Sequence, residues 1–543
     1  MSNEKAPEVS ESPAEFSVPT TLQETARAQQ KIEHDLTRWQ AIKLYPWTAL
    51  WILLIIWVLI LVGYENQAGG IVISIPQFRQ DFGKPFGDSY VLDSQWQSAI
   101  SGGPQGSVAI GSVIGSWFVD RFGRKWTMLV AVLLTLPFVT IEFISTTIEV
   151  FFVGKFLNGF CLGVLATVAT TYVSEVSPLA LRGIAAATCS LSFCIGPFIC
   201  YLINNTTSTY TSRMAYRGVF IPQWIFAAIA LSYLPFLPES PYYLILKGKE
   251  EQALKSLKKL YGQADLVQNQ FAVMKVTVEE SKLVSSKSGT YLDCFRLKDL
   301  KRTFIITFSF FMQSMSGVSF VAGYSTYYYQ LAGFSTQRSY QLSCGAQALS
   351  ISGVIASWFI IDRFGRRPLM LWGMLALTVL NLIVACTGLE TLNPTSMTVA
   401  SAFIAMYNFF YNINIGPLPY ILASEISSVF LRAKTMATAT TVNYAMQCMW
   451  SFVLPYMFNP DQANMGSKIN FIFTGCSLLS IFVFFIYLPE TAGRSFEEID
   501  EMYKMLVPPR KWKGYKTSIQ EESEEIYHEM EEKKNVSEHV ERV

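Results

Sequence analysis

The sequence predicts an all-α membrane protein with twelve transmembrane helices in two pseudo-symmetric six-helix bundles, joined by a small helical linker on the cytoplasmic side. Three observations predict this fold. Hydrophobic residues make up 51% of the chain and charged residues 15%, below the roughly 25% usual in soluble domains. Apolar segments near the roughly 20 residues that span a bilayer recur along the chain. Three charged motifs occur twice in the same order, which indicates two halves of equal topology.

The apolar segments are expected to be helices, because in hydrocarbon every backbone polar group must be paired within its own segment. Six precede a central hydrophilic stretch and six follow it. We place them at 47–66, 98–119, 126–146, 149–172, 181–203, 218–237, 303–329, 339–361, 368–388, 396–424, 434–457 and 468–488.

The repeated motifs lie at the ends of these segments, at offsets of 242, 250 and 251 residues. They are Asp120–Lys125 with Asp362–Arg367, Ser174–Ser177 with Ser424–Ser427, and Pro238–Ser240 with Pro489–Thr491. Such acids and bases can pair between helices and bias a carrier between two states. The alternative is that they are ordinary anchors at the membrane surface. We expect them to form a cytoplasmic gate from Asp120, Arg121, Arg124, Glu175, Arg182, Glu239, Asp362, Arg363, Arg366, Glu425, Arg432 and Glu490.

The basic residues of the short loops predict the orientation. Most of them fall on one side, with Arg213 and Arg217 as exceptions, and the positive-inside rule makes that side cytoplasmic, together with both termini. The expected domains are a disordered N-terminal tail (1–46), two bundles (47–244 and 302–494), the cytoplasmic linker (245–301) and a charged C-terminal tail (495–543). Overlapping sequons at Asn204 and Asn205 would face outside. A loop so close to the membrane can also remain unmodified.

Two ionisable side chains lie within expected spans. Glu65 belongs to the first and Lys155 to the fourth. Because a charge at bilayer depth costs a few kcal/mol, such residues pair with one another or face water. We expect Glu65 and Lys155 to form a pair. The alternatives are a hydrated Glu65 near the outer interface, or a fixed structural tie.

The chain resembles the sugar porter family of the major facilitator superfamily over nearly its whole length. The resemblance is carried by Asp120–Lys125, Pro238–Pro241, Asp362–Arg367, Gly416-Pro417 with Ser424-Glu425 and Arg432, and Pro489–Thr491 with Gly493-Arg494 and Glu497-Glu498. Other features resemble the fungal α-glucoside (maltose-type) permeases: Tyr291–Phe295, Gly323–Tyr327 and Pro489–Gly493.

The resemblance implies a role for the buried pair. Proton-coupled sugar porters have an acid in span one and an arginine at the span-four position, where this chain has Glu65 and Lys155. A proton taken up by Glu65 outside would weaken its hold on Lys155, and the neutral carrier would then rock inward and release the proton.

A sugar site needs amides, which both donate and accept hydrogen bonds, and flat aromatic faces. Spans seven, ten and eleven, which line the cavity in the family, are rich in both. Any single amide can instead make an interhelical hydrogen bond. The expected sugar-binding residues are Ser190, Gln313, Ser314, Ser319, Tyr324, Asn412, Tyr420, Asn443, Tyr444 and Gln447.

Departures from the family indicate a roomier cavity. Hexose carriers commonly have larger residues where Ser190, Ser314, Ser319, Tyr420 and Tyr444 stand here. A larger cavity suits a disaccharide. In addition, Gly416–Pro419 is expected to break span ten, because proline removes a backbone hydrogen bond.

The sequence therefore predicts a monomeric plasma-membrane transporter surrounded by lipid, which takes up an α-glucoside such as maltose with a proton by alternating access. The alternatives are an uncoupled hexose or pentose facilitator, and a nutrient sensor built on a transporter fold. The net charge of +1 indicates no nucleic-acid partner. Three histidines and no cysteine–histidine spacing of a metal site indicate neither an enzyme nor a metal or cofactor.

Overall fold

The computed structural model describes residues 25, 29, 36, 38–86, 89–286, 291–331, 333–389, 394–428, 431–459, 461–492, 494 and 496–517. Most of both predicted tails lies outside these residues. The chain divides into two compact units. Unit 1 comprises Met1–Ile52, Tyr172–Ala185 and Leu237–Ser288, and unit 2 comprises Leu53–Thr171, Ala186–Phe236 and Gly289–Val543.

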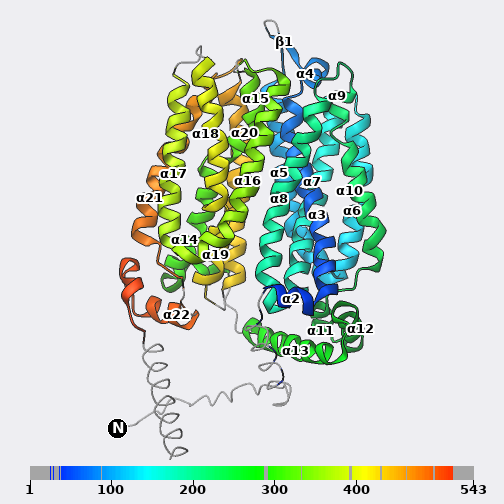
Figure 1. Cartoon of the computed structure of the whole chain (residues 1–543), viewed down its shortest axis with the longest axis vertical. Coiled ribbons are helices and arrows are strands. Elements are labelled where there is room, and N and C mark those ends of the chain that lie inside the picture. The colour runs from blue at the N-terminus through cyan, green and yellow to red at the C-terminus, as the bar shows by residue number, and fades with distance from the viewer. Residues whose placement is uncertain are drawn as a thin grey trace, which may run out of the picture. The chain divides into compact units, whose positions relative to one another are not determined.

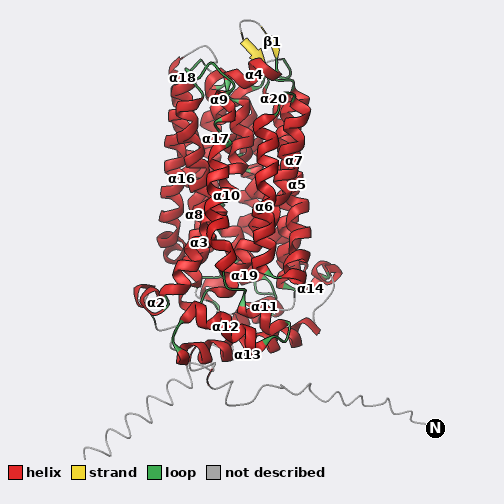
Figure 2. Ribbon diagram, turned by 90° about the vertical axis from the view of Figure 1, so that its right-hand side faces the viewer, coloured by secondary structure: helices red, strands yellow, loops and turns green. Residues whose placement is uncertain are grey.

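The first half of the chain forms six long helical segments in the predicted positions (Figure 1). Helices α3, α7 and α8 carry residues of both units. A short helix and an antiparallel hairpin, which the sequence analysis did not predict, follow α3 (Figure 2). The elements are α3 (Pro46–Ile73), α4 (Pro76–Phe82), β1 (Lys84–Phe86), β2 (Ser89–Val91), α5 (Ser94–Phe122), α6 (Arg124–Ile144), α7 (Ile148–Val176), α8 (Leu179–Thr207), α9 (Met214–Arg217), α10 (Ile221–Tyr233) and η1 (Leu234–Phe236).

The second half repeats this arrangement, with two of its spans interrupted. Span seven breaks at Ser316-Gly317, where Gly317 has φ +107°, and span ten breaks before Leu418, as Pro417 predicts. The elements are η2 (Tyr291–Phe295), α14 (Leu297–Met315), α15 (Val318–Leu331), α16 (Thr336–Phe364), α17 (Arg366–Thr387), α18 (Pro394–Ile413), α19 (Leu418–Ile426), α20 (Arg432–Phe458), η3 (Gly466–Ile469), α21 (Asn470–Tyr487), α22 (Phe496–Lys504) and η4 (Pro509–Gly514).

Nine helical segments in the described part of the chain are long and apolar enough to cross a membrane. The three other predicted spans are α5, α18–α19 and α20, which are more polar. Helices α5 and α20 pack against each other, and Ser98 donates a 2.9 Å hydrogen bond to the Phe452 carbonyl. Their polarity follows from facing the other half of the chain instead of lipid.

The repeated Asp-Arg-Phe-Gly-Arg motif makes the same turn in both halves. Gly123 separates α5 from α6 with φ +91°, and Gly365 separates α16 from α17 with φ +86°. Glycine is required there because a side chain is strained in this left-handed region. The following arginine is the first residue of the next helix in each case.

Small residues allow the helices of the first half to approach closely. A Cβ on Gly163 of α7 would lie 2.1 Å from the Val108 carbonyl oxygen of α5, and one on Gly111 of α5 would lie 2.2 Å from that of Phe160. Such contacts are how membrane helices associate when lipid offers no hydrophobic drive. These close approaches fix the position at which α5 and α7 cross.

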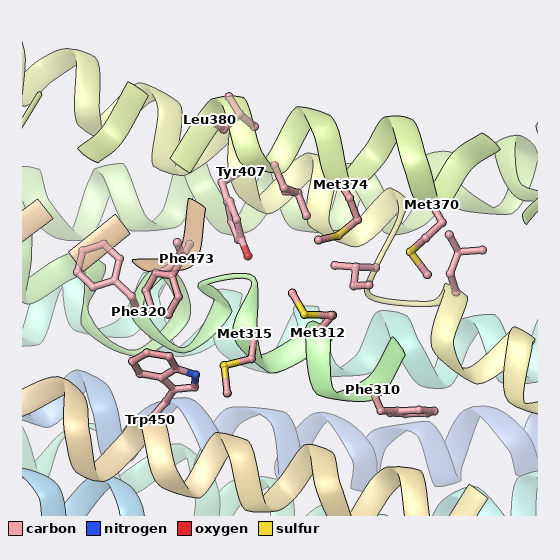
Figure 3. Close-up of a cluster of buried hydrophobic side chains, with 14 of the residues drawn as sticks. Phe310, Met312, Met315, Phe320, Met370, Met374, Leu380, Tyr407, Trp450 and Phe473 are labelled. Atoms are coloured by element: carbon pink, nitrogen blue, oxygen red, sulfur yellow. The ribbon is translucent and has the colours of Figure 1, made fainter. Parts of the chain in front are cut away.

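The second half has a continuous apolar core built from α14–α21 (Figure 3). It contains many methionines and aromatic rings, and Trp450 packs edge-on against Phe473 with ring centroids 4.8 Å apart. Flexible methionine side chains fill the irregular space beside the break in span seven.

Unit 1 contains the helices α2 (Arg38–Leu44), α11 (Pro241–Leu246), α12 (Glu250–Tyr261) and α13 (Ala264–Ser286). The amphipathic pattern of the predicted linker is that of α12, whose Leu257 and Leu260 are buried. Thr48 donates a 2.8 Å hydrogen bond to the Leu260 carbonyl. The longer α13 was not predicted.

Replacing Gly163 by leucine is expected to destabilise the protein by about 3 kcal/mol, because the new side chain would meet backbone across the α5–α7 crossing. The melting temperature of the purified protein in detergent measures this. Gly475→Leu is the control, because Gly475 lies on a helix with nothing within 4 Å of its Cβ position. Equal melting temperatures for the two variants would contradict the close approach.

Candidate transport site

A buried ion cluster lies among α3, α6 and α7. Lys155 Nζ donates to Glu65 Oε1 and lies 3.4 Å from Glu142 Oε2. The side chains of Lys155 and Glu65 are 2% exposed and that of Glu142 is fully buried. The structure thus brings together the two residues that the sequence analysis paired, and it excludes a solvent-exposed position for Glu65.

Glu142 was missed by the sequence analysis. It lies near the end of an expected span, where a charged residue is normally read as belonging to the membrane surface. A signal was available in Asn158, which follows Lys155 by three residues and so lies on the same face of α7. Asn158 is fully buried and donates a 3.1 Å hydrogen bond to Glu142 Oε1.

The cluster is enclosed by aromatic and amide groups. Lys155 Nζ lies 5.4 Å from the centroid of the Phe220 ring, a cation–π contact. Tyr64, the neighbour of Glu65, donates a 2.8 Å hydrogen bond to the Val219 carbonyl. Burial without a nearby aqueous surface strengthens the attraction between the charged groups.

A second polar network lies where spans seven and ten break. Gln313 donates to the carbonyls of Ile415 (3.3 Å) and Gly416 (2.8 Å), which the break in span ten releases from helical bonding. Asn443 of α20 donates to Gln313 Oε1 (2.9 Å) and to Ser314 Oγ (3.2 Å). Gln447 donates to Asn443 Oδ1 at 2.7 Å. Four of the ten predicted sugar-binding residues therefore form one network.

The other predicted sugar-binding residues are more dispersed. Tyr324 is buried and donates a 3.1 Å hydrogen bond to Ser101 of α5. The exposed Tyr420 packs edge-on against Phe310 with ring centroids 4.8 Å apart. Asn412 donates to the Asn408 carbonyl of its own helix at 2.8 Å. Ser190 is exposed, and Ser319 and Tyr444 are half-buried.

Polar contacts between the two halves were not predicted. Gln67 of α3, two residues beyond Glu65, donates to the Ala322 carbonyl of α15 (3.0 Å) and to Tyr201 of α8 (2.9 Å). Gln347 of α16 donates to the Cys194 carbonyl of α8 at 3.1 Å. These contacts connect the helix that carries Glu65 with the half that carries the amide network.

The halves are also joined at the end of unit 2 opposite the Gly123 and Gly365 turns. Ser74 and Tyr340 share a 2.7 Å hydrogen bond, and Arg79 donates to Gln330 at 2.9 Å. Asn459 donates to Ser94 at 2.9 Å. The two halves are therefore hydrogen-bonded to each other at this end.

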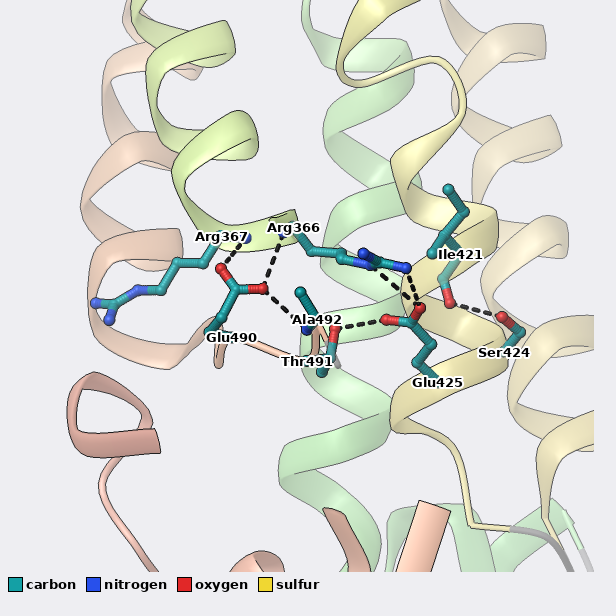
Figure 4. A network of polar contacts seen from close by, with 8 residues as sticks. All are labelled: Arg366, Arg367, Ile421, Ser424, Glu425, Glu490, Thr491 and Ala492. Carbon is teal, nitrogen blue, oxygen red and sulfur yellow. Dashed lines mark hydrogen bonds and ion pairs between the residues drawn. The ribbon is translucent and has the colours of Figure 1, made fainter. Parts of the chain in front are cut away.

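At the other end, the charged motifs of the second half form one network (Figure 4). Arg366 lies 2.9 Å from Glu425 Oε1, while Thr491 donates to Glu425 Oε2 at 2.5 Å. Glu490 accepts from the backbone N–H groups of Arg366 (2.9 Å) and Arg367 (3.2 Å). This places a carboxylate at the positive end of the α17 dipole.

The first half repeats part of this network within unit 1. Ser240 donates to Glu175 Oε2 at 2.5 Å, as Thr491 does to Glu425, and Glu239 accepts from the Ser240 N–H. The contact between a hydroxyl group and the glutamate of the Ser-Glu-x-Ser motif is therefore the same in each half.

The remaining predicted gate residues divide into two groups. Asp120, Arg121 and Arg363 are exposed, while Arg124 is buried and donates to the Val119 carbonyl at 3.2 Å. The side chains of Arg182, Asp362 and Arg432 lie outside the described part of the structure.

The first predicted sequon is poorly placed for glycosylation. Helix α8 continues to Thr207, beyond the expected end of span five. Asn204 is consequently fully buried and donates to the Cys200 carbonyl at 2.8 Å. Asn205 is half-buried. A transferase would need the acceptor asparagine exposed in a surface loop.

Known sequences similar to this chain are sugar permeases. The family model described as sugar (and other) transporter matches residues 51–503. The general alpha-glucoside permease of Saccharomyces cerevisiae is 30% identical over 491 residues, which cover 88% of this chain and 79% of the permease. Maltose permease MAL31 of the same yeast is 30% identical over 514 residues, covering 92% of this chain and 83% of that protein.

Solved structures share the fold. The inward-open xylose transporter XylE from E. coli superposes with a TM-score of 0.68 at 19% identity, covering 83% of this chain and 98% of XylE. The proton:xylose symporter XylE bound to 6-bromo-6-deoxy-D-glucose gives 0.65 at 19% identity, covering 84% and 100%. The chain therefore belongs to the sugar transporter family of the major facilitator superfamily and is a multi-pass membrane protein with that fold.

Proposed function

We propose that this sugar transporter is a plasma-membrane permease that takes up an α-glucoside disaccharide together with a proton. The observation that carries the proposal is the close pair of Lys155 and Glu65, which is buried in the first half and joined through Gln67 to the second. A carboxyl group that trades a proton for a buried ammonium partner is a means of coupling.

The same geometry supports alternating access. The end joined by the Ser74–Tyr340 and Arg79–Gln330 contacts is the outer end when the basic loops face the cytoplasm, with both termini on the inner side. The Arg366–Glu425 and Ser240–Glu175 contacts then lie at the cytoplasmic side. Because they hold helices of one half together, each half can move as a body while its own network persists.

The sugar is proposed to bind at the network of Gln313, Ser314, Asn443 and Gln447. Its amides can exchange their mutual hydrogen bonds for sugar hydroxyls, and Tyr420 offers an exposed aromatic face nearby on α19. Small side chains at Ser190 and Ser319 leave room for a second ring. The yeast relatives named α-glucoside and maltose permeases support this substrate class.

The substrate test uses purified protein in proteoliposomes with an inward proton gradient. Labelled maltose is expected to accumulate more than labelled glucose or xylose, and a protonophore is expected to abolish the accumulation. Asn443→Ala is expected to raise the KM for maltose about fivefold, because one lost hydrogen bond to the sugar costs about 1 kcal/mol.

Thr438→Ala is the matched control, because Thr438 lies on the same helix but donates only to the Lys434 carbonyl one turn away. Preferred uptake of a monosaccharide would contradict the disaccharide assignment. An unchanged KM in Asn443→Ala would move the sugar site elsewhere.

Glu65→Gln is expected to abolish accumulation against a gradient while sparing exchange of labelled for unlabelled sugar. The amide cannot take up a proton, but it fits the same space beside Lys155. Uptake and counterflow in the same vesicles provide the measurement.

Glu149→Gln is the control for this variant, because it removes an exposed carboxylate at the start of α7. Normal accumulation by Glu65→Gln would show that Glu65 does not carry the proton.

A further inference from the structure

The ion cluster contains a second acidic residue, Glu142, in addition to the predicted pair of Glu65 and Lys155. Lys155 carries one positive charge, and the two carboxylates within reach of its Nζ carry two negative charges when both are ionised. A buried net charge is costly, and one proton on either carboxyl group makes the cluster neutral. Glu65 Oε2 makes no hydrogen bond within the described residues and can take up that proton, while Glu142 Oε2 faces the ammonium group of Lys155.

We infer that Glu142 is a second acidic partner of the coupling site, which takes over Lys155 when Glu65 is protonated. This inference rests on the proposed proton coupling. A proton from the outer solution binds the Glu65 carboxylate, and no other bond is made or broken. Lys155 then turns to Glu142, already 3.4 Å away, and never becomes an unpaired buried cation. On the inner side the proton returns to water, and Lys155 again pairs with Glu65.

The packing keeps Glu142 in place for this exchange. A Cβ on Gly154 would lie 2.9 Å from Glu142 Cγ, so the glycine beside Lys155 makes room for the acid. Asn158 donates to Glu142 Oε1 and leaves Oε2 directed to the ammonium group. Glu142 is therefore positioned by two residues of α7 on either side of Lys155 along the chain.

The fold itself does not require an acid at this position. The offset that relates Arg124 to Arg366 places Val384 of α17 at the position of Glu142 in the second half. Val384 is a buried apolar residue of the second core. The repeated architecture thus forms with a valine at this position, so the carboxyl group of Glu142 is needed by the ion cluster and not by the fold.

Other ionisable and polar side chains near the cluster are those of Cys200, Gln223 and Arg217. Cys200 of α8 lies near Glu65, and the buried amide of Gln223 faces it from α10. Arg217 donates to the Ile144 and Ser145 carbonyls beyond the end of α6 instead of to Glu142.

The experiment measures how proton-driven maltose uptake depends on external pH in Glu142→Gln. Without a second carboxylate, protonating Glu65 strands Lys155, so Glu65 binds its proton more weakly. The pH of half-maximal uptake is expected to fall by at least about one unit, which is a tenfold higher proton requirement, while sugar exchange persists. Glu142→Asp keeps the charge at a longer distance and is expected to shift the profile less. Glu149→Gln is expected to leave it unchanged.

An unchanged pH profile in Glu142→Gln, or loss of sugar exchange by a variant that is folded by size-exclusion chromatography, would overturn the inference. If Glu142→Gln does not fold, Glu142→Asp carries the test, and a wild-type profile would then overturn it. Failure of the proposed function gives a different result. In that case, uptake by the wild-type protein would not depend on the proton gradient, and this is measured before any variant is compared.

Discussion

Charge is costly inside a membrane, and the buried ion cluster is arranged to meet that cost. Lys155 can remain charged at its depth because two carboxylates, from helices far apart in the sequence, reach its ammonium group. Removing one partner of a buried ion pair costs about 3–5 kcal/mol. The same energy that holds α3, α6 and α7 together is therefore available for coupling. In the proposed mechanism, a proton that neutralises one carboxylate changes the preferred arrangement of those helices, whereas a fixed apolar contact could not respond to a proton.

The backbone obeys the same constraint in the second half. Breaks in spans seven and ten release carbonyl groups that need partners in hydrocarbon. Gln313 provides two of the missing bonds, to Ile415 and Gly416, and Asn443 ties Gln313 to α20. An irregular backbone is tolerated in a membrane where it lines a protein cavity. The breaks and the amides thus form one network, and Gln67 links α15, the helix that follows the break in span seven, to the helix of Glu65.

Sequence reasoning predicted the features that follow from local chemistry. Hydropathy located the spans, and the repeated motif located the Gly123 and Gly365 turns, whose positive φ needs glycine. Features that depend on packing between distant helices were missed. Glu142 looks like a surface residue until α6 and α7 are placed side by side, and Gly317 breaks span seven without a proline. Asn204 appeared to lie in a loop because hydropathy falls before α8 ends.

We propose that sugar movement through the amide network is coupled to a proton at the ion cluster. Electrical recording on a solid-supported membrane tests it most directly, because proteoliposomes of the wild-type protein report charge that enters with a neutral sugar. A maltose concentration jump is expected to produce an inward positive current that grows as the external pH is lowered. Maltose transport without any current would contradict the account.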